Sequence, residues 1–197
     1  MSSSLPLVLV HGLWDTPRVF ERLRQQLAGR RPEIFSPHLP HRFGATGLLE
    51  LANQLDREIQ ARYGTEQPLD LLGYSMGGVV GRSWIQLLGG HQRCRRFISL
   101  GSPQQGTLVA QPWPRWPLAG VADMKIGSAL LQRLNGNLAP LEKLQCHSYY
   151  CLLDHMVVPS WRGVLPVGSV ERLPVQQHRQ LISSPLALGP ITEALLA

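Results

Sequence analysis

The chain has 197 residues, which favours one domain over residues 1–197. Hydrophobic residues make up 44% and charged residues 16%, a globular balance that excludes intrinsic disorder. The formal net charge is +6, from 19 Lys+Arg against 13 Asp+Glu. The arginines are scattered and are not interleaved with aromatic residues, so we expect no nucleic-acid partner. Weak contact with an anionic membrane surface stays open as an interpretation of this charge.

The three cysteines are odd in number, and their spacing matches no zinc pattern. The first residues, MSSSLPLVLVHG, lack a basic leader, and their apolar stretch is too short to span a bilayer. We therefore predict a cytoplasmic protein without a structural disulfide. Nothing in the sequence points to an obligate protein partner.

Apolar runs of strand length alternate with amphipathic segments of helical period. The predicted strands are 5–10, 33–36, 69–74, 96–100, 148–153 and 170–175. The predicted helices are 19–28, 48–63, 76–88, 128–134 and 177–182. This alternation predicts an α/β fold with about six mostly parallel strands and helices on both faces. An active site is then expected at the carboxyl ends of the strands.

Residues 108–120 break this rhythm. Seven of them read Gln-Pro-Trp-Pro-Arg-Trp-Pro, which excludes a regular helix interior. The segment fits a small lid or pocket rim, and it fits equally a proline-stiffened loop with its tryptophans packed on the body.

The strongest chemical signal is the sequence Gly73-Tyr74-Ser75-Met76-Gly77. It matches a nucleophile elbow, in which a serine on a strained strand-to-helix turn projects its hydroxyl out of the sheet. Glycines two positions before and after the serine avoid collisions with the neighbouring strands. The predicted strand before Ser75 and the predicted helix after it supply the context that this motif requires.

A second signal, His11-Gly12-Leu13, follows the first predicted strand. An acyl-transfer enzyme needs two backbone N–H donors for the oxyanion, and we expect them from Leu13 and Met76. His11 is predicted to hold the loop by a hydrogen bond rather than to act as a base.

A nucleophilic serine also needs a base, and the base needs an acid. The chain order Ser, Asp, His of this fold leaves His178, in a loop after the last predicted strand, as the best base. Asp154, at the end of predicted strand 148–153, is the best acid. Its rival Asp123 is interpreted as a local cap or turn residue ahead of helix 128–134.

These segments resemble the α/β-hydrolase superfamily, and in particular small bacterial lipases and esterases with a minimal, lid-poor core. Segments 100–107 and 121–135 also resemble lipase blocks, so the likeness covers roughly residues 5–188. It implies an ester hydrolase with the triad Ser75, Asp154 and His178 and the oxyanion donors Leu13 and Met76. No carboxylate cluster suits the calcium site of some secreted relatives, so we predict no metal and no cofactor.

The predicted reaction is hydrolysis of a small-molecule or lipid carboxylic ester through an acyl-enzyme. Trp14, Met156 and Val157 are predicted to contact the substrate. A thioesterase or acyltransferase with the same triad is the alternative, because the sequence does not identify the leaving group or the acceptor. A catalytically silent binding protein on this fold is the remaining reading.

Overall fold

A computed structural model describes residues 5–31 and 33–197, so residues 1–4 and 32 of the predicted domain lie outside it. Within these residues, six strands form one parallel sheet in the order β2-β1-β3-β4-β5-β6. The strands are β1 (Leu7–Val10), β2 (Ile34–Phe35), β3 (Leu69–Tyr74), β4 (Cys94–Leu100), β5 (Gln145–Tyr150) and β6 (Ser169–Arg172). The predicted sheet is confirmed.

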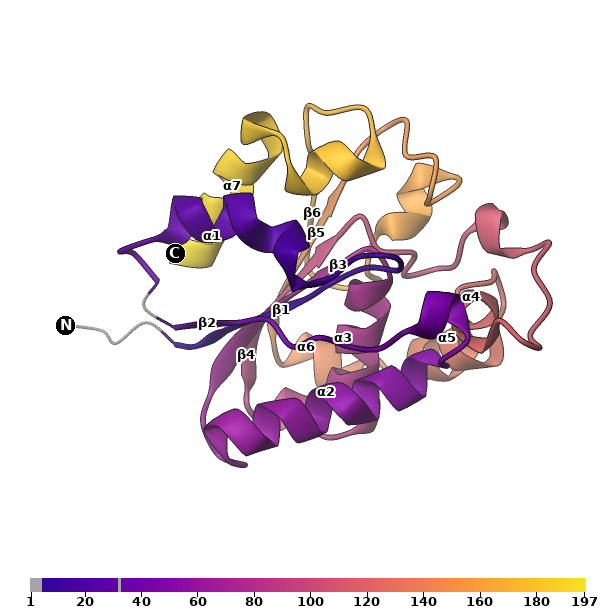
Figure 1. Ribbon diagram of the computed structural model, residues 1–197, viewed down its shortest axis with the longest axis horizontal. Helices are drawn as coiled ribbons and strands as arrows, with labels where there is room; N and C mark the ends of the chain where they lie inside the picture. Colours follow the sequence, from indigo (N-terminus) through magenta and orange to yellow (C-terminus); the bar gives the residue numbers. More distant parts are fainter. Residues whose placement is uncertain (1–4, 32) are drawn as a thin grey trace.

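Helices cover both faces of the sheet, as Figure 1 shows. The α-helices are α1 (Glu21–Leu27), α2 (Leu48–Tyr63), α3 (Met76–Leu87), α4 (Ala119–Asp123), α5 (Ala129–Asn135), α6 (Ala139–Glu142) and α7 (Pro185–Leu196). The 3-10 helices are η1 (Pro17–Phe20), η2 (Arg42–Gly44), η3 (Gly90–Gln92), η4 (Leu108–Ala110), η5 (Ser160–Gly163) and η6 (His178–Ile182). None of the helices in the described residues is long and apolar enough to cross a membrane.

The sheet separates two apolar layers. Helices α1 and α7 pack on one face, where Leu9, Leu72 and Ile98 point toward them. Helices α2 and α3 pack on the other, against Val8, Leu71 and Phe97. Because both faces are covered, β1 and β3 are buried throughout, and apart from Asp70 neither strand carries a charged residue.

Several elements differ from the prediction. Strand β5 ends at Tyr150 rather than at residue 153. Leu152 and Leu153 extend the apolar run in the sequence, which led to the longer prediction, but both side chains lie exposed in the following loop. Helix α7 was not predicted, since Pro190 interrupts its helical pattern. Short helices α4 and α6 were also missed, because four or five residues carry too little periodicity to stand out.

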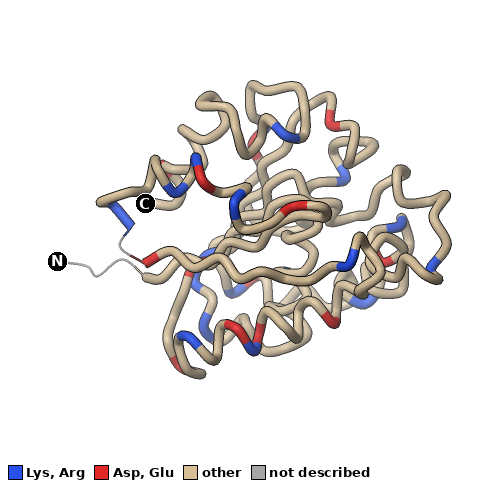
Figure 2. Tube along the Cα trace, in the orientation of Figure 1, with Lys and Arg blue, Asp and Glu red and all other residues tan. Residues whose placement is uncertain are grey.

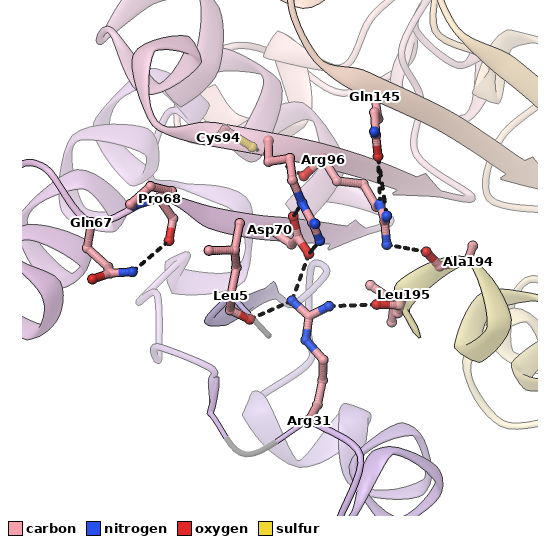
Figure 3. Close-up of polar contacts among 11 residues, drawn as sticks. Leu5, Arg31, Gln67, Pro68, Asp70, Cys94, Arg96, Gln145, Ala194 and Leu195 are labelled. Atoms are coloured by element: carbon pink, nitrogen blue, oxygen red, sulfur yellow. Dashed lines mark hydrogen bonds and ion pairs between the residues drawn. The ribbon is translucent and has the colours of Figure 1, made fainter. Parts of the chain in front are cut away.

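Ion pairs stabilise the amino ends of the strands, which we call the amino edge of the sheet, and the pair between Arg31 and Asp70 is buried (Figure 3). Asp70, the second residue of β3, is fully buried and contacts Arg31 at 2.7 Å and Arg95 at 2.6 Å. Arg31 also donates to the backbone oxygens of Leu5 and Leu195, at 2.7 and 2.6 Å. These bonds join the first strand, the central strand and the last helix at the edge of the sheet opposite the predicted site.

Candidate active site

Ser75 occupies the turn between β3 and α3. Its φ of 54° and ψ of −129° lie in a region that non-glycine residues rarely adopt, as a strained elbow requires. Its N–H donates to the carbonyl of Leu100 at 2.9 Å, which fixes the turn to the neighbouring strand β4. The serine therefore lies where the motif places a nucleophile.

The flanking glycines allow this turn for two different reasons. A Cβ at Gly77 would lie 2.1 Å from the carbonyl oxygen of Val10, so the neighbouring strand excludes a side chain there as predicted. A Cβ at Gly73 would instead lie 2.4 Å from the Cα of Gly78, on the elbow's own helix. The prediction that strands exclude both side chains is therefore wrong for Gly73, where the returning helix is the obstacle.

The loop after β1 lies directly against the serine. A Cβ at Gly12 would be 2.9 Å from Ser75 Cβ and 3.4 Å from its Oγ. Leu13 follows in this loop, and Met76 is the first residue of α3. In the part of the chain that the structure describes, neither N–H finds an acceptor. Both expected oxyanion donors are therefore free to bind a ligand beside Ser75.

His11 holds this loop from behind. Its ring is fully buried, its Nε2 accepts a hydrogen bond from the N–H of Leu39 at 3.1 Å, and its Nδ1 contacts the carbonyl of Gly12 at 3.0 Å. This arrangement requires a neutral ring with the proton on Nδ1. Desolvation by burial accordingly lowers the pKa of His11. The predicted structural role of His11 is confirmed.

Asp154 and His178 form a buried pair. Asp154 Oδ2 lies 2.7 Å from His178 Nδ1, while its Oδ1 accepts the N–H groups of Met156 and Val157 at 2.8 and 2.9 Å. Asp154 does not end a strand, as predicted, but lies in the loop four residues beyond β5. There the bonds from its own loop fix the carboxylate, so its position does not depend on the strand.

Three neighbours shape the surroundings of this pair. The ring of Tyr74 stacks on the ring of His178, with centroids 5.1 Å apart and 28° between the planes. Gly101 leaves room for the imidazole, because a Cβ there would lie 3.3 Å from His178 Cε1. Cys151 Sγ lies 3.8 Å from Asp154 Oδ2, and desolvation by burial raises the pKa of this thiol to about 12. The thiol is therefore neutral beside the carboxylate.

Two hollows meet at Ser75. One pocket contains Tyr74, His155, His178 and Arg179 beside Ser75, so it brings serine and histidine to one space; we call it the histidine pocket. An apolar cavity, partly open to solvent, also borders Ser75. Its remaining lining comprises Leu13, Trp14, Phe43, Pro103, Thr107, Val109, Ala110, Trp113, Leu118, Val121, Met124, Met156 and Val157.

All three residues predicted to contact substrate, Trp14, Met156 and Val157, line this cavity. Sequence reasoning missed Phe43 and the contribution of α4, which no motif marks. Trp113 of segment 108–120 also lines the cavity, whereas Trp116 is 86% exposed. The interpretation of this segment as a loop with both tryptophans packed on the body is therefore wrong, and Trp113 lies at a pocket rim.

Two residues that could compete with the proposed acid and base, Asp123 and His147, do not contact Asp154 or His178. Asp123 Oδ2 accepts the N–H of Leu48 at 2.9 Å and its Oδ1 pairs with Arg115, so it caps distant α2. The prediction of a local cap before helix 128–134 is thus wrong, since Ser128 caps that helix itself. His147 lies within β5 and contacts Ser169, outside both hollows. The described residues contain no cluster of three potential metal ligands.

Solved structures share this fold over nearly the whole chain. A Bacillus licheniformis lipase, BlEst2 in its mature form, superposes with a TM-score of 0.75 and 17% identity, over 99% of this chain and 93% of that one. Aspergillus fumigatus lipase B gives 0.76 and 15%, over 98% and 53% of the two chains. The fold is therefore that of an α/β-hydrolase, as the sequence resemblance implied.

The sequence identifies the family within this class. Residues 6–159 match the palmitoyl protein thioesterase family, and the chain belongs to it. The lysosomal thioesterase PPT2 of Homo sapiens is 29% identical over 119 residues, which is 58% of this chain and 39% of that protein. The match therefore spans well under two thirds of this curated relative. The chain is therefore a member of a thioesterase family with the α/β-hydrolase fold.

Proposed function

We propose that the protein hydrolyses long-chain acyl thioesters, with Ser75 as nucleophile, His178 as base and Asp154 as the acid that orients the base. The carrying observation is the position of Ser75, at the junction of an apolar cavity and the histidine pocket that holds His178. The apolar cavity suits an acyl chain, and the histidine pocket, where His178 can protonate a leaving group, suits the departing thiol. Membership of a thioesterase family favours a thioester over the oxygen ester expected first.

The proposed reaction has two steps. His178 takes the Ser75 proton as Oγ attacks the acyl carbonyl, and the N–H groups of Leu13 and Met76 receive the oxyanion. His178 then protonates the departing thiolate, which leaves an acyl-serine ester. Water, deprotonated by His178, attacks that ester and releases the fatty acid and the free serine. Asp154 keeps the Nδ1 proton in place throughout and stabilises the imidazolium.

The cavity also accounts for selectivity in the proposed reaction. Its lining is almost wholly aliphatic and aromatic, apart from Ser75 and Thr107. Each methylene buried there contributes about 0.8 kcal/mol, so kcat/KM is expected to rise severalfold per methylene until the cavity is full.

A matched substrate series tests the proposal. Acyl thioesters and oxygen esters of the same chain lengths are compared with wild-type protein and Ser75→Ala. We expect the thioester of a long chain to have the highest kcat/KM, and Ser75→Ala to lose about 10⁴-fold or more in kcat. Preference for the oxygen esters would restore the esterase reading, and turnover by folded Ser75→Ala would refute the nucleophile. A fluorophosphonate probe, which should label only the wild type, checks the serine independently.

A further inference from the structure

Large apolar side chains stand exposed around the mouth of the apolar cavity. Trp14, Phe43 and Trp113 line the cavity, yet they are 63%, 77% and 51% exposed. Together with their exposed neighbours they form a surface that we call the mouth rim. It consists of Trp14, Phe43, Val109 and Trp113, which line the cavity, and of exposed Leu108 and Trp116 from the same chain segment as Trp113. Such a concentration of exposed apolar side chains marks an interaction surface more often than chance.

The backbone holds these side chains outward. In the described residues, four non-glycine residues have positive φ: the proposed nucleophile Ser75, and Trp14, Arg42 and Phe43 at 62°, 47° and 55°. Each such conformation costs about 1 kcal/mol or more and persists only where the surroundings impose it. Three of the four residues with positive φ thus lie at or beside the rim.

The loop that carries the two rim tryptophans is also fixed. Its first residue, Thr107, donates its N–H to the carbonyl of Met124 at 2.9 Å, and Leu108 donates to Val158 at 2.8 Å. Three prolines stiffen the stretch that follows, and Arg115 between the tryptophans bonds Asp123 at 2.8 Å. These contacts fix the loop with Trp113 and Trp116 exposed.

The charge of the rim is one-sided. Segments 40–47 and 107–118 contain Arg42 and Arg115 and no Asp or Glu, and Figure 2 shows no carboxylate along the loop at 108–117. Asp15, beside Trp14, is already paired with Arg179 at 2.6 Å. Exposed Arg42 has no carboxylate partner within the described part of the chain. Tryptophan with arginine is the composition that favours the interface of an anionic bilayer.

We propose that the mouth rim is a membrane-docking surface that rests on an anionic lipid bilayer. Trp116 and Phe43 enter the interfacial layer, and Arg42 contacts the lipid phosphates. The cavity mouth then opens onto the bilayer, so an acyl chain held there reaches Ser75 without crossing water. This last consequence rests on the proposed function, whereas the docking itself does not.

Vesicle co-sedimentation tests the docking, with vesicles of phosphatidylcholine alone or mixed with phosphatidylglycerol. We expect wild type to bind the anionic vesicles more tightly, and Trp116→Ser to lose about tenfold in binding. Arg42→Gln should lose about fivefold on anionic vesicles and little on neutral ones. Leu186→Ser, which removes an exposed leucine at the start of α7, is the matched control and should bind like wild type.

Two further measurements separate the possible outcomes. Ser75→Ala should bind vesicles normally, so docking survives even if the proposed reaction fails. Trp116→Ser should keep its turnover of a short, water-soluble acyl thioester, because Trp116 lines neither hollow. Equal vesicle binding by wild type and Trp116→Ser overturns the proposal. A dimer that Trp116→Ser converts to a monomer in sedimentation also overturns it and assigns the rim to a second copy of the chain.

Discussion

Each edge of the sheet holds one buried aspartate, and the two are bound very differently. At the amino edge, Asp70 contacts Arg31 and Arg95, two cations that stay charged at every physiological pH (Figure 3). At the carboxyl edge, Asp154 contacts His178 and two backbone N–H groups of its own loop. The histidine in turn lines an open pocket shared with Ser75.

The difference shows which surroundings allow a buried carboxylate to take part in catalysis. Two guanidinium groups pair with Asp70, and Arg31 also bonds two backbone oxygens, so no side chain that contacts this carboxylate readily exchanges a proton. Asp154 faces a partner that can gain and lose a proton and that reaches a cavity. Both carboxylates are buried. The titratable partner and the open space distinguish the candidate active site.

Replacing each of the two aspartates by asparagine should give the largest difference between the two edges, because one variant should lose activity and the other stability. Asp154→Asn should lower kcat by about 10³- to 10⁴-fold, because the amide favours the wrong histidine tautomer, while the melting temperature changes little. Asp70→Asn should lower the free energy of unfolding by about 3–5 kcal/mol, because it leaves Arg31 buried without its carboxylate. Its kcat per folded molecule should stay within about twofold of wild type.

Steady-state kinetics and urea unfolding of the two variants check this pair of predictions. A folded Asp154→Asn with normal kcat would remove Asp154 from the proposed triad. Asp123→Asn is the control, because Asp123 caps α2 and should cost stability but not turnover.

The carboxyl edge could be predicted from sequence far better than the amino edge. The elbow at Ser75 has its own local signature. Chain order then excludes the three histidines before Ser75, and the expected positions of the other four favour His178. Asp70, in contrast, occupies an apolar strand, and its partners Arg31 and Arg95 belong to separate segments. Ion pairs between distant segments leave no periodic trace in the sequence, so this cluster was not predicted.

The lining of the apolar cavity could be predicted only in part. Trp14, Met156 and Val157 were predicted because each follows a motif residue closely. Phe43 and Val121 line the same space but come from η2 and α4, whose positions depend on packing. Asp123 shows the same limit, since its cap bond spans 75 residues and no local pattern specifies α2 as its partner.

The stacking of Tyr74 on His178 should have a smaller effect than the ion pair. Tyr74→Leu removes the ring face and should lower kcat by about three- to tenfold, with KM for the acyl chain nearly unchanged. Tyr74→Phe keeps the ring and loses only the 3.4 Å bond to the His178 carbonyl, so about twofold is expected. If the phenylalanine variant loses as much as the leucine variant, the hydroxyl rather than the ring positions the histidine.

The smallest predicted effect is the part of the pH dependence of stability that comes from His11, beside the candidate site. Burial lowers the pKa of His11 below its ordinary value of 6.5, and its Nε2 must stay unprotonated to accept from Leu39. Above pH 6.5 the contribution of His11 to stability is complete. As the pH falls below that value, the unfolded chain takes up a proton that the folded ring resists, so stability declines.

The decline due to His11 is at most about 1.4 kcal/mol per pH unit, and it stops below the folded pKa. His147, whose pKa burial also lowers, adds a similar trend, so the test is a difference between proteins. His11→Gln keeps an oxygen acceptor for Leu39 without a titrating ring. Urea unfolding between neutral and mildly acid pH should show a shallower slope for His11→Gln than for wild type. Parallel slopes for the two proteins would mean that the stability of the loop beside Ser75 does not depend on a neutral His11.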